Sequence, residues 1–225
     1  HQGRMIGNFG DAEFFSFHAT KFVNAFEGGA VTTNDDKLAQ KMRYMRNFGF
    51  SNYDTVDHVG VNGKMHEVSA AMGLTSLENL DSIVAVNRRN YECYAEQVAG
   101  IPGVTLYDYN EDERRNYQYV ILEIDETQTG INRDTLIRLF HAENVLARRY
   151  FYPGCHQMEP HRSYFPHAGL LLPNTESLVQ KVMSLPTGTA IQPEDITQIC
   201  ELLRLAVEKG PDIISKLTGS RHDRQ

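Results

Sequence analysis

Residues 10–35 read GDAEFFSFHATKFVNAFEGGAVTTND, and this stretch decides how the rest of the chain is interpreted. Within it, Glu13–Phe17 is short, apolar and aromatic, which predicts a buried strand. Glu27-Gly28-Gly29 predicts a turn, and Ala30–Thr33 is a second short strand containing β-branched residues. The polar run from His18 to Lys21 would therefore follow the first strand, where a rigid backbone can present reactive groups.

Lys21 is the candidate reactive group of this stretch. A deprotonated lysine amine condenses with an aldehyde to form a Schiff base, and desolvation or neighbouring cations lower its pKa toward that state. On residue chemistry alone, a solvated lysine at a strand end is the favoured alternative, because most lysines are exposed charges. Ser16 could equally be an ordinary strand residue. His18 has no second histidine at metal-ligand spacing, so we expect no metal site.

The chain beyond this stretch alternates helical and strand patterns. Asn34 or Asp35 is suited to cap a helix, and a long irregular loop is expected at 47–64. We expect further helices at 67–80, 83–98, 133–142, 175–182 and 193 to about 208, and strands at 117–124, 145–151 and 183–186. The polar tail from Gly210 is expected to fray. From about residue 104 onward the pattern predicts a small α/β domain.

The composition is that of an ordinary globular protein and excludes several classes of partner. The 225 residues are 41% hydrophobic and 23% charged, with a net charge of -7, which argues against nucleic-acid binding. No apolar run approaches the roughly 20 residues of a membrane helix, and no signal peptide is evident. The three cysteines are far apart and indicate a reducing compartment, so we expect a cytoplasmic protein. The chain starts without Met, as a fragment would.

Motifs in a fixed order give the chain a family resemblance. The run at 10–35 is followed by Arg46-Asn47-Phe48-Gly49, Gly60–Glu67, Ala70–Leu74, Phe151–His156 and Leu185-Pro186-Thr187-Gly188. Together these resemble the DegT/DnrJ/EryC1/StrS family of sugar aminotransferases, in which Ser-Phe-His-x-x-Lys precedes a Glu-Gly-Gly turn. The resemblance spans nearly the whole chain, which makes it far more specific than any one motif.

The resemblance implies a fold and a domain organisation. The fold would be α/β and aspartate-aminotransferase-like, the type I fold of transferases that depend on pyridoxal 5'-phosphate (PLP). Residues 1–80 would be the latter part of the large PLP-binding domain, 81–103 a linking helix, and 104–225 the small C-terminal α/β domain. Family members carry an N-terminal half of the cofactor domain before this point, so these 225 residues alone are not expected to be an active transaminase.

The resemblance also implies roles for individual residues. Lys21 would hold PLP as an internal aldimine and then move the proton between substrate and cofactor. Ser16 would bind the cofactor phosphate, and Asn62 would reach the phosphate of the partner subunit in a homodimer with shared active sites. His18, Tyr152 and His156 would line the sugar pocket, although a structural role explains each of them equally well.

The implied reaction is transfer of an amino group from glutamate to a keto group of a nucleotide-activated deoxysugar. A dTDP-4-keto-6-deoxyglucose type of substrate is preferred, and Lys21 favours transamination over the dehydration catalysed by family members with histidine there. The alternatives are a 3-keto-sugar, GDP-sugar or cyclitol aminotransferase, or a non-catalytic, interaction-only homologue. Gly63-Lys64 departs from the family's Tyr-Arg, which keeps the charge but loses the ring and the forked guanidinium. Phe26 departs from the small residue often found before Glu-Gly-Gly.

Overall fold

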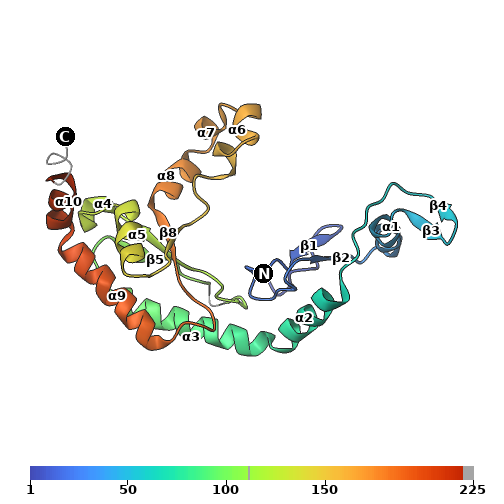
Figure 1. The fold of residues 1–225 in the computed structure, drawn as a ribbon, viewed down its shortest axis with the longest axis horizontal. Helices are drawn as coiled ribbons and strands as arrows, with labels where there is room; N and C mark the ends of the chain where they lie inside the picture. Colours follow the sequence, from blue (N-terminus) through green and yellow to red (C-terminus); the bar gives the residue numbers. More distant parts are fainter. Residues whose placement is uncertain (111, 220–225) are drawn as a thin grey trace. The chain divides into compact units, whose positions relative to one another are not determined.

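The computed structural model describes residues 1–110 and 112–219, and the chain divides into two compact units (Figure 1). The first unit contains residues 1–83 together with 110–115. The second contains residues 84–109 and the chain from Asn116 onward. The two units differ in construction, because the first buries few apolar side chains and the second has a continuous core.

The first unit is built from short strands and two helices. Its elements are β1 (Glu13–Ser16), β2 (Gly29–Thr32), α1 (Asp36–Arg46), β3 (Phe50–Asn52), β4 (Thr55–Val56) and α2 (Glu67–Glu78). β1 and β2 pair antiparallel, with Ser16 opposite Gly29. The α1 helix begins after Asp35, whose carboxylate accepts hydrogen bonds from the backbone of Lys37 and Leu38 at 2.8 and 3.1 Å. The predicted cap is therefore confirmed.

Two expectations for this unit were wrong in detail. The strand at Glu13–Ser16 exists but is not buried, since Phe14 is 79% exposed. Phe14 is exposed because, within the described residues, β1 pairs only with β2 and no second layer covers this side chain. The segment 47–64 is also not wholly irregular, because β3 and β4 form a small antiparallel pair.

The second unit is a four-stranded sheet with helices packed against it (Figure 1). The strand order is β5-β6-β8-β7, and every pair is antiparallel. The strands are β5 (Val104–Leu106), β6 (Val120–Ile124), β7 (Arg148–Arg149) and β8 (Val182–Leu185). The helices are α3 (Leu80–Val98, in this unit from Val84), α4 (Glu126–Thr129), α5 (Arg133–Ala142), η1 (Cys155–Gln157), α6 (His161–Tyr164), α7 (Ala168–Leu171), α8 (Pro173–Lys181), α9 (Pro193–Glu208) and α10 (Gly210–Gly219).

The core of the second unit lies between the sheet and its helices. Alternate residues of β6 point inward, so that Val120, Leu122 and Ile124 are at most 2% exposed. The α5 helix begins where predicted, with the Asn132 side chain accepting from the backbone of Thr135 at 2.9 Å. The α9 helix also matches its prediction, with proline in its first turn. Local capping signals therefore placed both helices correctly.

Two other segments differ from expectation. The strand predicted at 145–151 is reduced to Arg148–Arg149, because the Ala147 amide donates to the carbonyl of Val145 in a turn before it and Phe151 has φ +45° after it. The tail expected to fray from Gly210 forms α10 instead. Ile213 and Ile214 pack against the core, and this tertiary contact stabilises the helix. The polar composition of the tail did not indicate it. The last six residues of the predicted domain lie outside the described residues.

The Leu-Pro-Thr-Gly motif after β8 is anchored by α3. The Tyr94 hydroxyl donates to the carbonyl of Pro186 at 2.9 Å, and the buried Asn90 amide donates to the carbonyl of Gly188 at 3.0 Å. Arg89 adds a hydrogen bond to the carbonyl of Ile191 at 3.0 Å. These contacts pair three backbone oxygens and fix the connection between β8 and α9.

Candidate functional site

The connection between β1 and β2, residues 17–28, is a closed loop that carries Lys21. The Phe17 amide donates to the carbonyl of Gly28, and the Ala25 amide donates to the carbonyl of Phe17, both at 2.9 Å. Inside the loop the Lys21 amide donates to the carbonyl of His18 at 2.9 Å. This loop, hereafter the lysine loop, therefore has a backbone held by its own hydrogen bonds.

The α2 helix braces the lysine loop from one side. Ser76 is 6% exposed, and its hydroxyl donates to the carbonyl of Asn24 at 2.8 Å. Ala25 is fully buried, and a Cβ added to Gly73 of α2 would lie 3.4 Å from its methyl group. The helix that the sequence placed after the Gly60–Glu67 motif thus supports the loop that carries the candidate nucleophile.

The amine of Lys21 is available for chemistry. The side chain is half-buried, and among residues 1–110 and 112–219 its ammonium group makes no hydrogen bond or ion pair. Asn24 donates to the Lys21 carbonyl at 3.3 Å and so holds the backbone rather than the amine. A lysine without a carboxylate partner on a braced loop fits the requirement for condensation with an aldehyde.

Ser16 is the last residue of β1, immediately before the lysine loop, and His18 lies at the start of that loop. Ser16 is exposed, and its hydroxyl accepts a long hydrogen bond from the His18 amide at 3.4 Å. The His18 ring pairs with the Thr20 hydroxyl at 2.9 Å and lies 3.6 Å from a Glu27 carboxylate oxygen. The predicted residues His18 and Lys21 thus lie on the lysine loop, and Ser16 lies at the end of the strand that leads into it.

Asn62 lies on a second loop that two of the sequence motifs form together. The Phe48 amide donates to the carbonyl of Val61 at 3.0 Å, and the Val61 amide donates to the carbonyl of Met45 at 2.8 Å. Asn47 and Asn62 form an antiparallel bridge. We call the paired segments 45–49 and 60–63 the asparagine clasp. Asn62 is exposed, and its side chain has no hydrogen-bond partner in the described part of the chain.

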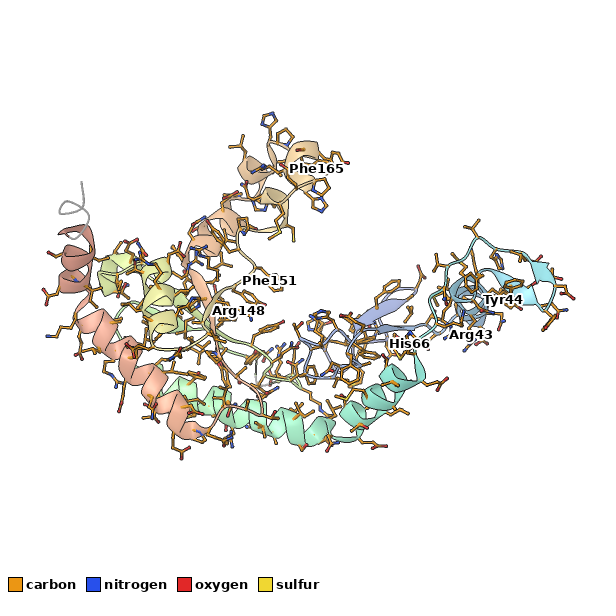
Figure 2. All side chains as sticks on the ribbon, in the orientation of Figure 1. Arg43, Tyr44, His66, Arg148, Phe151 and Phe165 are labelled. Atoms are coloured by element: carbon orange, nitrogen blue, oxygen red, sulfur yellow. The ribbon has the colours of Figure 1, made fainter. Side chains whose placement is uncertain are left out.

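Side chains around the asparagine clasp stabilise it further. The Lys64 ammonium lies 3.2 Å from the Asn47 amide oxygen and 4.4 Å above the Phe48 ring. On α1, Tyr44 stacks on His58 with ring centroids 5.7 Å apart; Tyr44 is labelled in Figure 2. Lys64 therefore has an intramolecular role where the family resemblance had placed an arginine.

Two glycines make the asparagine clasp possible. A Cβ on Gly60 would lie 2.3 Å from the backbone nitrogen of Gly49 and 2.5 Å from the carbonyl oxygen of Met45. Gly49 has φ +87°, and a Cβ there would lie 1.7 Å from the carbonyl oxygen of His58. The sequence did not reveal this pairing. The only local signal was that each motif contains a glycine.

Tyr152 and His156 lie in the segment of the second unit that follows β7, with His156 inside η1. The His156 ring is 9% exposed and pairs with the Glu176 carboxylate on α8 at 2.7 Å. This pairing, with a further hydrogen bond from Gln157, lowers the pKa of the Glu176 carboxyl below its usual value. His156 therefore anchors the loop to α8. Arg148 and Phe151, at the start of this segment, are labelled in Figure 2.

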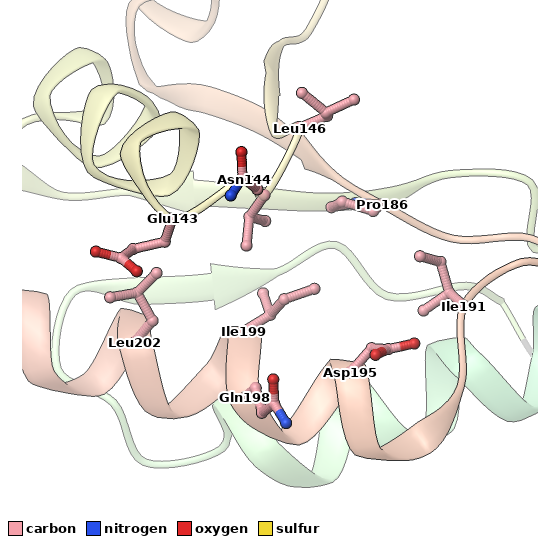
Figure 3. A pocket seen from close by; sticks show the side chains of 10 residues that line it. Glu143, Asn144, Leu146, Pro186, Ile191, Asp195, Gln198, Ile199 and Leu202 are labelled. Carbon is pink, nitrogen blue, oxygen red and sulfur yellow. The ribbon is translucent and has the colours of Figure 1, made fainter.

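A cavity of about 520 Å³ in the second unit contains none of the predicted site residues (Figure 3). It lies between the end of α5 and α9, and its lining includes Glu143, Leu146, Ile191, Asp195 and Leu202. Within the described residues no cluster of potential metal ligands occurs. No helix of that part of the chain is long and apolar enough to cross a membrane.

The arrangement defines the class of protein. Solved structures with the same architecture have the aspartate-aminotransferase-like fold of PLP-dependent transferases. In this chain the lysine loop follows β1 and is closed by its own backbone hydrogen bonds. The model of the DegT/DnrJ/EryC1/StrS aminotransferase family matches residues 1–204. The chain belongs to this family, whose members are PLP-dependent aminotransferases.

Individual relatives add detail. The chain is 33% identical over 178 residues to dTDP-4-amino-4,6-dideoxy-D-glucose transaminase of Escherichia coli, covering 79% of this chain and 48% of the relative. The crystal structure of DesI with its TDP-sugar product is 50% identical, with a TM-score of 0.88 over 96% of this chain and 54% of that one. The crystal structure of S. venezuelae DesV in complex with a ketimine intermediate is 26% identical, with a TM-score of 0.82 over 92% of this chain and 54% of that one. The chain thus spans about half the length of these relatives.

Proposed function

We propose that the intact protein is a PLP-dependent aminotransferase that moves an amino group from glutamate to a keto group of a dTDP-activated deoxysugar, of the dTDP-4-keto-6-deoxyglucose type. The observation that carries this proposal is the lysine loop. Lys21 is half-buried, its amine is unpaired among the described residues, and its backbone is held by the loop and by α2. Such an amine suits covalent capture of an aldehyde cofactor.

Each residue near Lys21 has a part in this proposal. The Lys21 amine would hold PLP and, once released, accept and return the proton of the substrate carbon. The hydroxyl of Ser16 would donate to the cofactor phosphate. When bound, PLP supplies an electron-accepting ring that stabilises negative charge on that carbon. His18, Tyr152 and His156 would border the sugar, with His156 acting through its contact to Glu176.

The proposal extends to domains and assembly. Residues 1–80 would be the latter part of the cofactor domain, 81–103 a linking helix and 104–225 the small domain. We propose a cytoplasmic homodimer, in which Asn62 reaches the cofactor phosphate of the other subunit. The exposed and unpartnered amide of Asn62, on a loop braced by the asparagine clasp, supports this role.

The choice of sugar rests on two relatives. The Escherichia coli relative is named for a dTDP-4-amino-4,6-dideoxyglucose product, and the DesI structure contains a TDP-sugar product. These names favour a 4-keto sugar on dTDP over the 3-keto, GDP-linked and cyclitol alternatives.

An amination assay tests the proposal. The intact protein would be incubated with PLP, glutamate and a panel of nucleotide ketosugars, and the product mass would be recorded. We expect a product with an amino group in place of the ketone from dTDP-4-keto-6-deoxyglucose, and none with Lys21→Ala. Lys37→Ala, a change at an exposed lysine of α1, is the matched control and should retain activity. Amination of only a GDP-sugar or a cyclitol would overturn the substrate choice, and no amination of any kind would favour an interaction-only homologue.

A further inference from the structure

The ring of Tyr152 lies close to two guanidinium groups. The central carbon of Arg149 is 4.7 Å from the ring centroid, and that of Arg133 is 5.2 Å from it. Both distances lie within the range of cation–π attraction. The hydroxyl of Tyr152 makes no hydrogen bond to the described residues. The two arginines therefore contact the ring, while the hydroxyl remains able to hydrogen-bond a ligand.

The two arginines are fixed by a shared carboxylate. Asp134, in the first turn of α5, accepts from Arg149 through both oxygens, at 2.9 and 3.0 Å. It also accepts from Arg133 at 2.5 Å. A forked contact of this kind fixes the plane of a guanidinium group as well as its position. The orientation of Arg149 against Tyr152 is therefore determined by α5 and β7 together.

Arg133 forms the immobile side of this arrangement. Its side chain is 1% exposed, and it donates to the carbonyls of Val179 and Val182 at 2.9 and 2.6 Å. Arg149 is the accessible side, with 46% of its side chain exposed. The far end of the same loop is held by His156 on Glu176. The loop therefore has contacts on both sides of Tyr152, and Arg149 is the contact that can be altered at least structural cost.

We propose that Arg149 is a positioning residue that, together with the buried Arg133, orients Tyr152 so that the tyrosine hydroxyl hydrogen-bonds the nucleotide-sugar substrate. This inference rests on the proposed function, because it requires that a nucleotide sugar binds against the loop of Tyr152. It goes beyond that function by assigning a role to the Asp134–Arg149–Tyr152 contacts. The expected ligand group is a sugar hydroxyl or a phosphate oxygen, since a phenol can donate to either.

The test uses four variants of the intact protein: Arg149→Gln, Arg149→Lys, Tyr152→Phe and the double variant Arg149→Gln/Tyr152→Phe. Arg138→Gln is the matched control, because Arg138 is an exposed arginine of α5 with no contact to the Tyr152 ring. The primary readout is the dissociation constant of dTDP-4-amino-4,6-dideoxyglucose, measured by calorimetry on cofactor-free protein. The KM and kcat of amination and the thermal midpoint are measured alongside.

If Arg149 acts through Tyr152, Arg149→Gln and Tyr152→Phe each weaken binding about tenfold. The double variant should then bind no more weakly than Tyr152→Phe, because the hydrogen bond that Arg149 helps to position is already absent without the hydroxyl. Arg149→Lys keeps a cation above the ring but loses the forked contact, so its affinity should lie between those of Arg149→Gln and the unchanged protein. The KM for the sugar should rise in the same order, with the thermal midpoint of Arg149→Lys preserved.

Three results would overturn the inference. Binding by Arg149→Gln equal to that of Arg138→Gln would show that Arg149 does not position Tyr152. Additive losses in the double variant would mean that Arg149 contacts the ligand by itself. Failure of the unchanged protein to bind or aminate any nucleotide sugar would remove the proposed function together with this inference. The first two results, obtained with an active unchanged protein, would leave the proposed function standing.

Discussion

Replacement of Gly60 by alanine should open the asparagine clasp. The added methyl group would lie 2.3 Å from the backbone nitrogen of Gly49 and 2.5 Å from the carbonyl oxygen of Met45. Both neighbours are backbone atoms, which cannot rotate away as the end of a side chain can. Because carbon contacts are favourable only near 3.5–4.0 Å, the two segments must separate by about 1 Å.

The size of the effect follows from the contacts that this separation breaks. The hydrogen bonds from Val61 to Met45 and from Phe48 to Val61 are 2.8 and 3.0 Å long, so a shift of this size lengthens both beyond useful range. Each contributes about 1 kcal/mol net, giving a local destabilisation of about 2 kcal/mol. That free energy corresponds to a roughly 30-fold increase in the population of the open form.

Amide hydrogen exchange measures this opening directly. In Gly60→Ala the amides of Val61 and Phe48 should exchange about 30-fold faster, while those of the α9 core stay protected. Gly63→Ala is the matched control in the same loop, because its Cβ would meet Arg46 at 3.4 Å, an ordinary contact distance. Equal exchange in Gly60→Ala and Gly63→Ala would refute the steric argument.

Two further predictions concern the second unit. The hydrogen bonds from His156 and Gln157 lower the folded-state pKa of Glu176. The ionised Glu176 therefore stabilises the fold above its unfolded-state pKa, and this stabilisation is lost as the pH falls through the folded-state pKa. The stability difference between the unchanged protein and Glu176→Gln in urea should therefore shrink below about pH 4.5, and a difference that is constant with pH would contradict this. Arg133→Met leaves the carbonyls of Val179 and Val182 without their donor and should cost about 2–5 kcal/mol in urea unfolding. Arg162→Met, at an exposed ion pair, should cost at most about 1 kcal/mol, and equal costs would contradict the argument.

Features that depend on neighbouring residues could be predicted from the sequence. The starts of α1, α5 and α9 followed from Asp35, Asn132 and Pro193, because a cap or a first-turn proline acts within one helical turn. The lysine loop could also be located, since its strand, turn and polar run are contiguous. These signals operate over a few residues and need no knowledge of the fold.

Features that depend on distant residues could not be predicted in this way. The exposure of Phe14 depends on which layer covers β1. The strand order β5-β6-β8-β7 depends on pairs of residues that are far apart in the sequence, such as Val120 and Leu185, which more than sixty residues separate. The contact of Tyr152 with Arg133 likewise joins α5 to a loop beyond β7. Nothing in the local composition of these segments indicated that they meet.

Borohydride trapping would identify the lysine that binds the cofactor. The intact protein would be mixed with PLP, reduced to make the lysine adduct permanent, digested, and mapped by mass spectrometry. We predict a phosphopyridoxyl group on Lys21, with the visible absorbance of the bound cofactor lost in Lys21→Ala and kept in Lys37→Ala. An adduct on another lysine, or an unchanged absorbance band in Lys21→Ala, would contradict the assignment of Lys21 as the cofactor lysine.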